Sequence, residues 1–166
     1  ALNTRVLGYD LKPREEMEGI VEYVSKEELL RQSDVVSLHV DLNPTSEGLL
    51  TKAEFDQMKP GASLVNASRG PVVNTADLIN ALKDGPLAFA ALDTVEGEGP
   101  IFNADHRQDG LKGEPLVEEL HAMNNVILTP HIAFFTNIAV QNMVDISLDD
   151  VITILNGQPS EHEVAN

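Results

Sequence analysis

The sequence predicts an α/β fold built on a doubly wound parallel β-sheet. Short apolar segments rich in β-branched residues alternate along the whole chain with segments of helical periodicity. These short segments are apolar at consecutive positions, which is typical of parallel strands covered on both faces. The chain has 166 residues, of which 42% are hydrophobic, so it is long enough to bury the core of one domain.

The first half of the chain predicts four strands and two helices. The strands are apolar runs at residues 5–10, 20–24, 34–40 and 62–66. Ser25 and Thr51 each stand three residues before a glutamate, which is the sequence of a capping box. We therefore expect helices from these caps to Gln32 and to Lys59, where Pro60 and a glycine stop the second one.

The second half predicts two more strands, at 87–92 and 126–129, and three helices. Thr75 is expected to cap a helix that runs through Lys83, and residues 117–123 form a short helix. Apolar residues recur at steps of three and four from Thr136 to Leu155, so they share one face of a long helix. Residues 96–115 are predicted to be an irregular loop, and the polar tail from Ser160 is expected to fray.

Charge and composition exclude several classes of function. The formal net charge is −16 and the isoelectric point is about 4.4, so phosphate backbones and anionic lipid surfaces would repel the chain. We therefore expect neither a nucleic acid nor a membrane as a partner. The absence of cysteine excludes disulfides and thiolate catalysis, and it fits a reducing, cytoplasmic location.

Polar residues follow the predicted strands at the edge where a parallel sheet binds ligands. They are Asp10, His39, Asp41, Asn66 to Arg69, Asp93 to Glu98 and His131. Asp10 could accept both hydroxyls of an adenosine ribose, or it could cap a helix or a solvated turn. Each residue is a weak signal alone, so the set has to be interpreted together.

Two members of this set could take part directly in binding or catalysis. Arg69 could grip a carboxylate with two parallel hydrogen bonds, and Gly70 would let the backbone approach a ligand. A surface arginine beside a structural glycine is the plainer alternative. His131 could act as a general acid and base, because its unperturbed pKa of about 6.5 is near neutral pH. It could equally be a capping or buried histidine. His106, His121 and His162 show no ligand spacing and no partner, so we expect no metal site.

Five segments in register resemble the D-isomer-specific 2-hydroxyacid dehydrogenase family over roughly 150 residues. They are VLGYD at 6–10, DVVSLHV at 34–40, MKPGASLVNASRG at 58–70, AALDTVEGE at 90–98 and NVILTPHIAFFT at 125–136. Residues 98–102, followed by a loop, are similar to the D-lactate and D-2-hydroxyisocaproate branch. The resemblance implies a Rossmann-like NAD-binding domain over residues 1–157, with a polar tail over 158–166.

The resemblance also implies roles for individual residues. Arg69 would hold the substrate carboxylate, His131 would donate the proton to the keto oxygen, and Glu98 would hydrogen-bond His131. Asp10 would bind the adenosine ribose of NAD. The remaining cofactor-binding residues would run along NAD towards its nicotinamide end; they are His39, Val40, Asp41, Ser46, Ala67, Ser68, Arg69 and Asp93. Asp41 stands where the family usually has proline, which would weaken cofactor binding.

The family's first strand and its Gly-rich phosphate loop have no counterpart in the sequence, so the resemblance implies a partial domain. The strands at 5–10 and 34–40 would then lack the neighbour that they share. Three explanations fit: a partial copy of a longer protein, direct pairing of the two strands, or a strand supplied by a second chain.

Two functions are therefore open. One is an NAD-dependent dehydrogenase that interconverts 2-keto acids and D-2-hydroxy acids, as a homodimer when full length and as a fragment inactive alone. The other is a non-catalytic relative that senses a dinucleotide or binds a partner. The presence of Arg69, Glu98 and His131 favours the enzyme.

Overall fold

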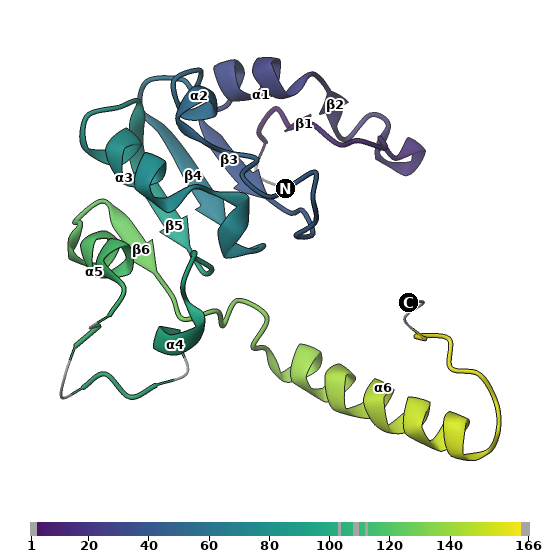
Figure 1. The fold of residues 1–166 in the computed structure, drawn as a ribbon. Helices are drawn as coiled ribbons and strands as arrows, with labels where there is room; N and C mark the ends of the chain where they lie inside the picture. The colour runs from purple at the N-terminus through teal and green to yellow at the C-terminus, as the bar shows by residue number, and fades with distance from the viewer. Residues whose placement is uncertain (1–2, 103, 108–109, 112, 164–166) are drawn as a thin grey trace. The chain divides into compact units, whose positions relative to one another are not determined.

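The computed structural model describes residues 3–102, 104–107, 110–111 and 113–163. The chain divides into two compact units, residues 1–131 and residues 132–166. The first unit holds the sheets and the second holds one long helix (Figure 1). No helix in these described ranges is both long and apolar enough to cross a bilayer.

Four parallel strands form the main sheet, in the order β3-β4-β5-β6. Their bounds are β3 Val35–Leu38, β4 Ala62–Asn66, β5 Leu87–Leu92 and β6 Val126–Leu128. The register pairs Leu38 with Asn66, and Asn66 with Leu92. The carboxyl ends of these three strands therefore lie side by side, as the sequence predicted. β4 and β5 have the predicted bounds, whereas β3 and β6 are shorter than predicted.

A separate two-stranded parallel sheet precedes the main one. It pairs β1 (Leu7–Gly8) with β2 (Glu22–Tyr23). Among the strands that the structure describes, β1 pairs with β2 and β3 pairs with β4, and no ladder joins β1 to β3. Direct pairing of the strands at 5–10 and 34–40, one of the three explanations considered, is therefore not observed.

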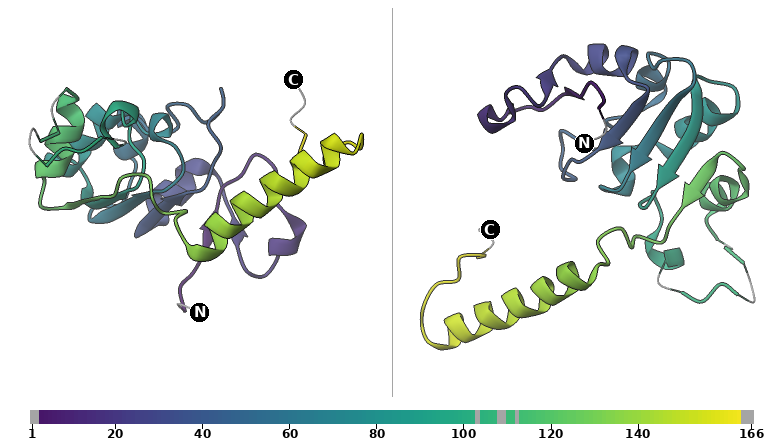
Figure 2. Two further views of the ribbon diagram at one scale, coloured as in Figure 1. Left: turned by 90° about the horizontal axis from the view of Figure 1, so that it is seen from below. Right: turned by 180° about the vertical axis from the view of Figure 1, so that it is seen from behind.

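Three helices pack on one face of the main sheet. They are α2 (Lys52–Phe55), α3 (Thr75–Lys83) and α5 (Pro115–Ala122), and Figure 2 (right) shows the sheet from behind. Burial alternates along β3, where Val36 and Leu38 are buried and Val35 is exposed. The core therefore lies between the sheet and these helices, around fully buried side chains such as Leu64 and Leu120.

Capping residues begin the helices at or near the predicted positions. Ser25 accepts the N–H of Glu28 and starts α1 (Lys26–Gln32). α3 is capped by Asn74 instead of the predicted Thr75, because the amide oxygen of Asn74 accepts the N–H of Asp77. The helix predicted from Thr51 to residue 59 is only one turn long, since α2 ends at Phe55.

The predicted loop at 96–115 contains one further short helix, α4 (Gly99–Phe102). Two 3-10 turns, Glu15–Met17 and Gly70–Val72, complete the first unit. In the second unit α6 runs from Asn137 to Leu155, and the hydroxyl of Thr136, where the predicted helical pattern begins, caps it by accepting the N–H of Ala139.

The described part of the tail, up to residue 163, makes hydrogen bonds to α6, although the sequence predicted fraying. Asp150 on the helix accepts the Ser160 hydroxyl at 2.7 Å and lies 3.0 Å from Nδ1 of His162. These contacts raise the pKa of His162 and lower that of Asp150, through the hydrogen bond between them. His162 therefore has a partner, which corrects the expectation that it is an unpaired surface residue. His106 also has partners, since its ring nitrogens face the carbonyl oxygens of Ile101 and Gly110.

Candidate functional site

Backbone hydrogen bonds join the loops that leave β4, β5 and β6. The N–H of Asp93 donates to the carbonyl of Asn66 at 2.8 Å, directly after both strands end. The N–H of His131 donates to the carbonyl of Asp93 at 2.9 Å. Asn66, Asp93 and His131 thus form one row across the carboxyl edge of the sheet, where the sequence placed the chemistry.

The predicted contact between Glu98 and His131 is present. Oε1 of Glu98 lies 2.6 Å from Nδ1 of His131, and its other oxygen accepts the N–H of Val95 at 2.8 Å. The Glu98 side chain is 22% exposed and the His131 side chain 37% exposed. Because Glu98 is fixed by backbone as well as by the ring, it determines the orientation of the imidazole.

His131 has a left-handed backbone conformation, with φ of +53°. A side chain with a Cβ is strained there, and strain of this kind persists only where the surroundings hold it in place. The surroundings here are the two carbonyls that its N–H contacts, those of Asp93 and Thr129. Backbone strain of this kind is common at functional sites, so the conformation of His131 is consistent with a functional role.

Arg69 is exposed on the loop after β4, and its Nη1 donates to the carbonyl of Ser68 at 2.7 Å. The next residue, Gly70, lies against the backbone of the β5 loop. A Cβ at this position would lie 2.2 Å from the carbonyl carbon and oxygen of Val95. Gly70 therefore serves close packing of two protein segments, in agreement with the structural glycine that the sequence left open as the plainer alternative.

Two residues predicted beside the nicotinamide are held within the protein. Ser68 is buried, and both its N–H and its hydroxyl donate to the amide oxygen of Asn66. Asp93 is buried, and it accepts the hydroxyl of Thr129 at 2.5 Å. Ala67, which precedes Ser68, is exposed. Sequence reasoning did not assign a role to Asn66 or Thr129, although each stands at or just after a strand end.

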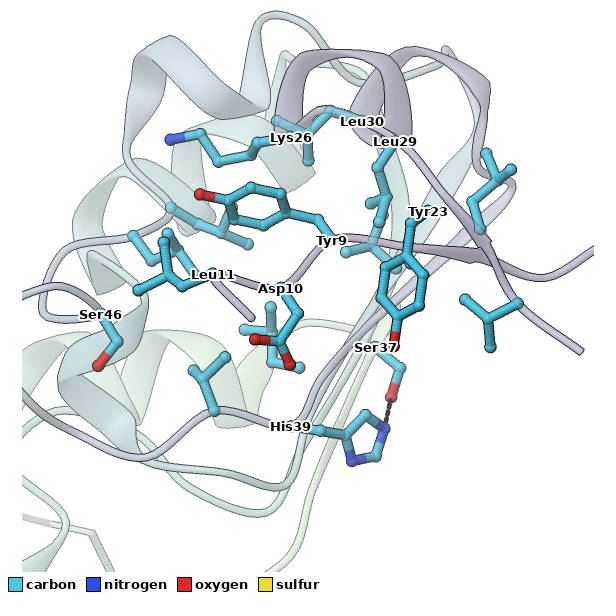
Figure 3. A pocket seen from close by; sticks show the side chains of 18 of the residues that line it. Tyr9, Asp10, Leu11, Tyr23, Lys26, Leu29, Leu30, Ser37, His39 and Ser46 are labelled. Atoms are coloured by element: carbon cyan, nitrogen blue, oxygen red, sulfur yellow. Dashed lines mark hydrogen bonds between the residues drawn. The ribbon is translucent and has the colours of Figure 1, made fainter. Parts of the chain in front are cut away.

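The other predicted cofactor residues line a cavity of about 580 Å³ between the β1 segment and the edge of β3 (Figure 3). They are Asp10, His39, Val40, Asp41 and Ser46. Arg69, Ala67, Ser68 and Asp93 do not line it. The structure therefore separates the predicted set into a group around the cavity and a group at the strand ends of the main sheet.

Polar side chains of the cavity make short local contacts. Asp10 accepts the N–H of Lys12 at 2.8 Å, so the carboxylate also forms the turn that the sequence left as an alternative. Nε2 of His39 lies 2.8 Å from the Ser37 hydroxyl, on the side of the cavity to which the Asp10 carboxylate points (Figure 3). Ser46 is buried, and its hydroxyl donates to the carbonyl of Asp41.

The cavity lies between the strands at 5–10 and 34–40, which the sequence predicts to lack their shared neighbour. Its lining includes the carboxylate of Asp10 and the apolar side chains of Leu29, Val40 and Leu49. In the described part of the chain, no group of three or more acidic or histidine side chains could hold a metal ion. The prediction that the protein has no metal site stays a prediction.

Comparison with known proteins identifies this architecture. Residues 1–133 match the family described as D-isomer specific 2-hydroxyacid dehydrogenase, NAD binding domain. The chain belongs to the D-isomer-specific 2-hydroxyacid dehydrogenase family. The predicted resemblance, the Rossmann-type parallel fold and the assignment of NAD as the cofactor of this domain are thereby confirmed.

Individual relatives of this dehydrogenase family agree with the match. D-lactate dehydrogenase of Staphylococcus aureus (strain MSSA476) is 40% identical over 94% of this chain and 47% of its own length. A solved D-lactate dehydrogenase from Sporolactobacillus sp is 48% identical, with a TM-score of 0.91 over 98% of this chain and 48% of that one. The D-lactate dehydrogenase of Lactobacillus jensenii, solved with NAD+, has 38% identity and a TM-score of 0.90, over 98% of this chain and 48% of that one.

The chain spans about half the length of the curated dehydrogenases that it matches. The activity of the whole protein is therefore proposed below.

Proposed function

We propose that this chain is the NAD-binding part of a dehydrogenase that interconverts 2-keto acids and D-2-hydroxy acids. The observation that carries the proposal is the Glu98–His131 pair, held at 2.6 Å on adjacent strand ends within a domain of the 2-hydroxyacid dehydrogenase family. A paired histidine is what protonation of a keto oxygen requires.

Three residues of this chain would have separate roles in the reaction. His131 donates a proton to the keto oxygen of the substrate, and the imidazole then regains a proton from solvent. Glu98 holds Nδ1, so that the opposite ring nitrogen is the one available to the substrate. Arg69 binds the substrate carboxylate through its guanidinium fork and stabilises the developing alkoxide. When bound, NADH supplies the hydride.

Cofactor binding would begin at the cavity. Asp10 would accept hydrogen bonds from the adenosine ribose, and its charge would repel the 2′-phosphate of NADP. His39, Val40, Asp41 and Ser46 would line the path from there, and Ala67, Ser68 and Asp93 would flank the nicotinamide. The position of Asp10, His39, Val40, Asp41 and Ser46 in the cavity lining supports their part of this proposal. The position of Ala67, Ser68 and Asp93 after the ends of β4 and β5 supports theirs.

The assembly and location of the protein are part of this proposal. We place the full-length protein in the cytoplasm as a homodimer, on the resemblance to the family and on the absence of cysteine. The partners would be a small 2-keto or D-2-hydroxy acid, and no nucleic acid or membrane, in agreement with a net charge of −16.

The test is NADH oxidation by the natural polypeptide that contains this chain. We expect oxidation with pyruvate or a larger 2-keto acid, and a product that chiral chromatography identifies as the D-hydroxy acid. Binding of NADH without turnover of any 2-keto acid would support the non-catalytic alternative instead. Formation of the L-hydroxy acid would contradict the proposal.

A further inference from the structure

Asn66 is the last residue of β4 and its side chain is almost completely buried, with 1% of its surface exposed. Its amide oxygen accepts the N–H of Ser68 at 3.1 Å and the hydroxyl of Ser68 at 2.9 Å. Its amide nitrogen donates to the carbonyls of Arg69 at 3.1 Å and of Thr94 at 3.5 Å. Both donors and both acceptor positions of the amide are therefore engaged.

These four contacts join two different loops. Ser68 and Arg69 belong to the loop after β4, whereas Thr94 belongs to the loop after β5 that leads to Glu98. The close approach of Gly70 to Val95 joins the same two loops a few residues further on. One buried amide thus fixes the backbone of Arg69 relative to the segment that holds Glu98 and, through it, His131.

We infer that Asn66 is a positioning residue for substrate binding, which acts by setting where Arg69 presents its guanidinium. The inference rests on the proposed function, because it concerns the carboxylate of a 2-keto acid. A two-bond grip on a carboxylate depends on direction as well as distance, so a small shift of the Arg69 backbone has a large effect on binding.

The variant Asn66→Asp tests the inference. Aspartate has nearly the same shape and keeps the acceptor oxygen for Ser68, but as a carboxylate it cannot donate to the carbonyls of Arg69 and Thr94. Those carbonyls would then face a negative charge, and the loop would move. We expect KM for the 2-keto acid to rise by about 10- to 100-fold and kcat to fall less. The Kd of NADH should rise less than KM does, because Ser68 and Arg69 are the only proposed cofactor residues whose hydrogen bonds with Asn66 change.

Asn125 offers a matched control outside the site. Its amide nitrogen also donates to two backbone carbonyls, those of Leu82 at 3.3 Å and of Ala88 at 3.2 Å. It stands just before β6, away from the strand ends that carry Arg69 and His131. Asn125→Asp should lower Tm as Asn66→Asp does, while KM stays at the wild-type value.

A binding measurement separates positioning from general loss of structure. Oxamate has the carboxylate of pyruvate but is not reduced, so its Kd in the presence of NADH reports the grip of Arg69. We expect that Kd to rise with Asn66→Asp and to stay constant with Asn125→Asp. If Asn66→Asp does not fold, Asn66→Ser removes the amide without adding a charge. KM for the 2-keto acid and the Kd of oxamate are then measured on that variant.

The outcomes are distinguishable. If the two aspartate variants lower Tm alike and neither changes KM or the Kd of oxamate, the positioning role is wrong and the proposed function stands. If the wild-type protein reduces no 2-keto acid, the proposed function is wrong and this inference is overturned with it.

Discussion

The strand ends of the main sheet and the cavity beside β3 are organised in different ways. At the strand ends, Asn66 contacts Thr94, Asp93 contacts Thr129, and Glu98 contacts His131, so each of the three has a hydrogen-bond partner on another loop. Around the cavity, Asp10 contacts a residue two positions away and His39 contacts Ser37, which is also two positions away. The proposed acid–base pair therefore joins distant segments, whereas Asp10 and His39 have local partners.

The two regions also differ in how completely the described strands enclose them. The proposed acid–base pair is preorganised by residues between 66 and 131, all within one compact unit. The cavity has one wall from β1 and another from β3, and no strand of the described chain joins the two. We therefore expect changes at the strand ends to alter catalysis and changes around the cavity to alter cofactor affinity.

The largest effect is expected for His131→Ala. Removal of a general acid costs about a thousandfold in kcat, while the binding of NADH should change little. Steady-state kinetics of the natural polypeptide with a 2-keto acid measure the first, and fluorescence titration measures the second. The exposed His121 provides the control, because His121→Ala should leave both quantities unchanged. A fall in kcat of less than about tenfold would remove His131 from the proposed role.

Gly70→Ala should destabilise the protein by about 3 kcal/mol, because its methyl group would overlap the carbonyl of Val95. The contact it breaks joins the Arg69 loop to the Glu98 loop, so the residual activity should also show a raised KM. Gly99→Ala is the matched control, since a Cβ there meets no atom within 4 Å. Urea denaturation of both variants measures the difference, and equal stability of the two would contradict the packing role.

Glu54→Gln tests the ion pair between Glu54 and Lys26, whose nitrogen and oxygen lie 3.0 Å apart. Lys26 lines the cavity wall. Burial raises the pKa of Glu54, but hydrogen bonds from Thr51 and Lys26 outweigh burial and lower it from 4.5 to about 2. A lowered pKa in the folded state stabilises the fold above pH 4.5 and loses that effect as the pH falls towards 2.

We therefore expect Glu54→Gln to cost about 2 kcal/mol of unfolding free energy at pH 7, with the deficit shrinking between pH 4.5 and pH 2. Denaturation curves at several pH values measure it. Asp56→Asn is the control, because Asp56 pairs with Lys52 on the exposed surface. A deficit that is independent of pH would show that the carboxylate charge of Glu54 does not stabilise the fold.

The smallest effect is expected for Asp10→Asn. The change should weaken NADH binding by about tenfold and bring NADPH binding closer to that of NADH. Titration with each nucleotide measures the ratio of the two Kd values. A ratio equal to that of the wild-type protein would show that Asp10 only forms its turn with Lys12.

Much of the fold was predictable from local sequence. Alternation of apolar and helical segments predicted the parallel sheet. β4 and β5 begin and end where predicted because they are central strands, each paired with a neighbour on both sides. Edge strands were less predictable, since β3 and β6 are paired by fewer residues than their apolar sequences suggest. The cap of α3 was misplaced by one residue, because Thr75 and Asn74 are both good caps and a distant carboxylate, Glu96, takes the N–H of Thr75.

The sequence by itself determined the family, the bounds of β4 and β5 and the identity of the polar residues that follow the strands, because those depend on residues near one another in the chain. Only the tertiary structure decided how these residues are held. The roles of Asn66 and Gly70 depend on contacts with a loop about 25 residues away, which no local pattern encodes. The left-handed conformation of His131 is likewise held in part by the carbonyl of Asp93, which the loop after β5 brings to its N–H, so it becomes visible only in the folded chain.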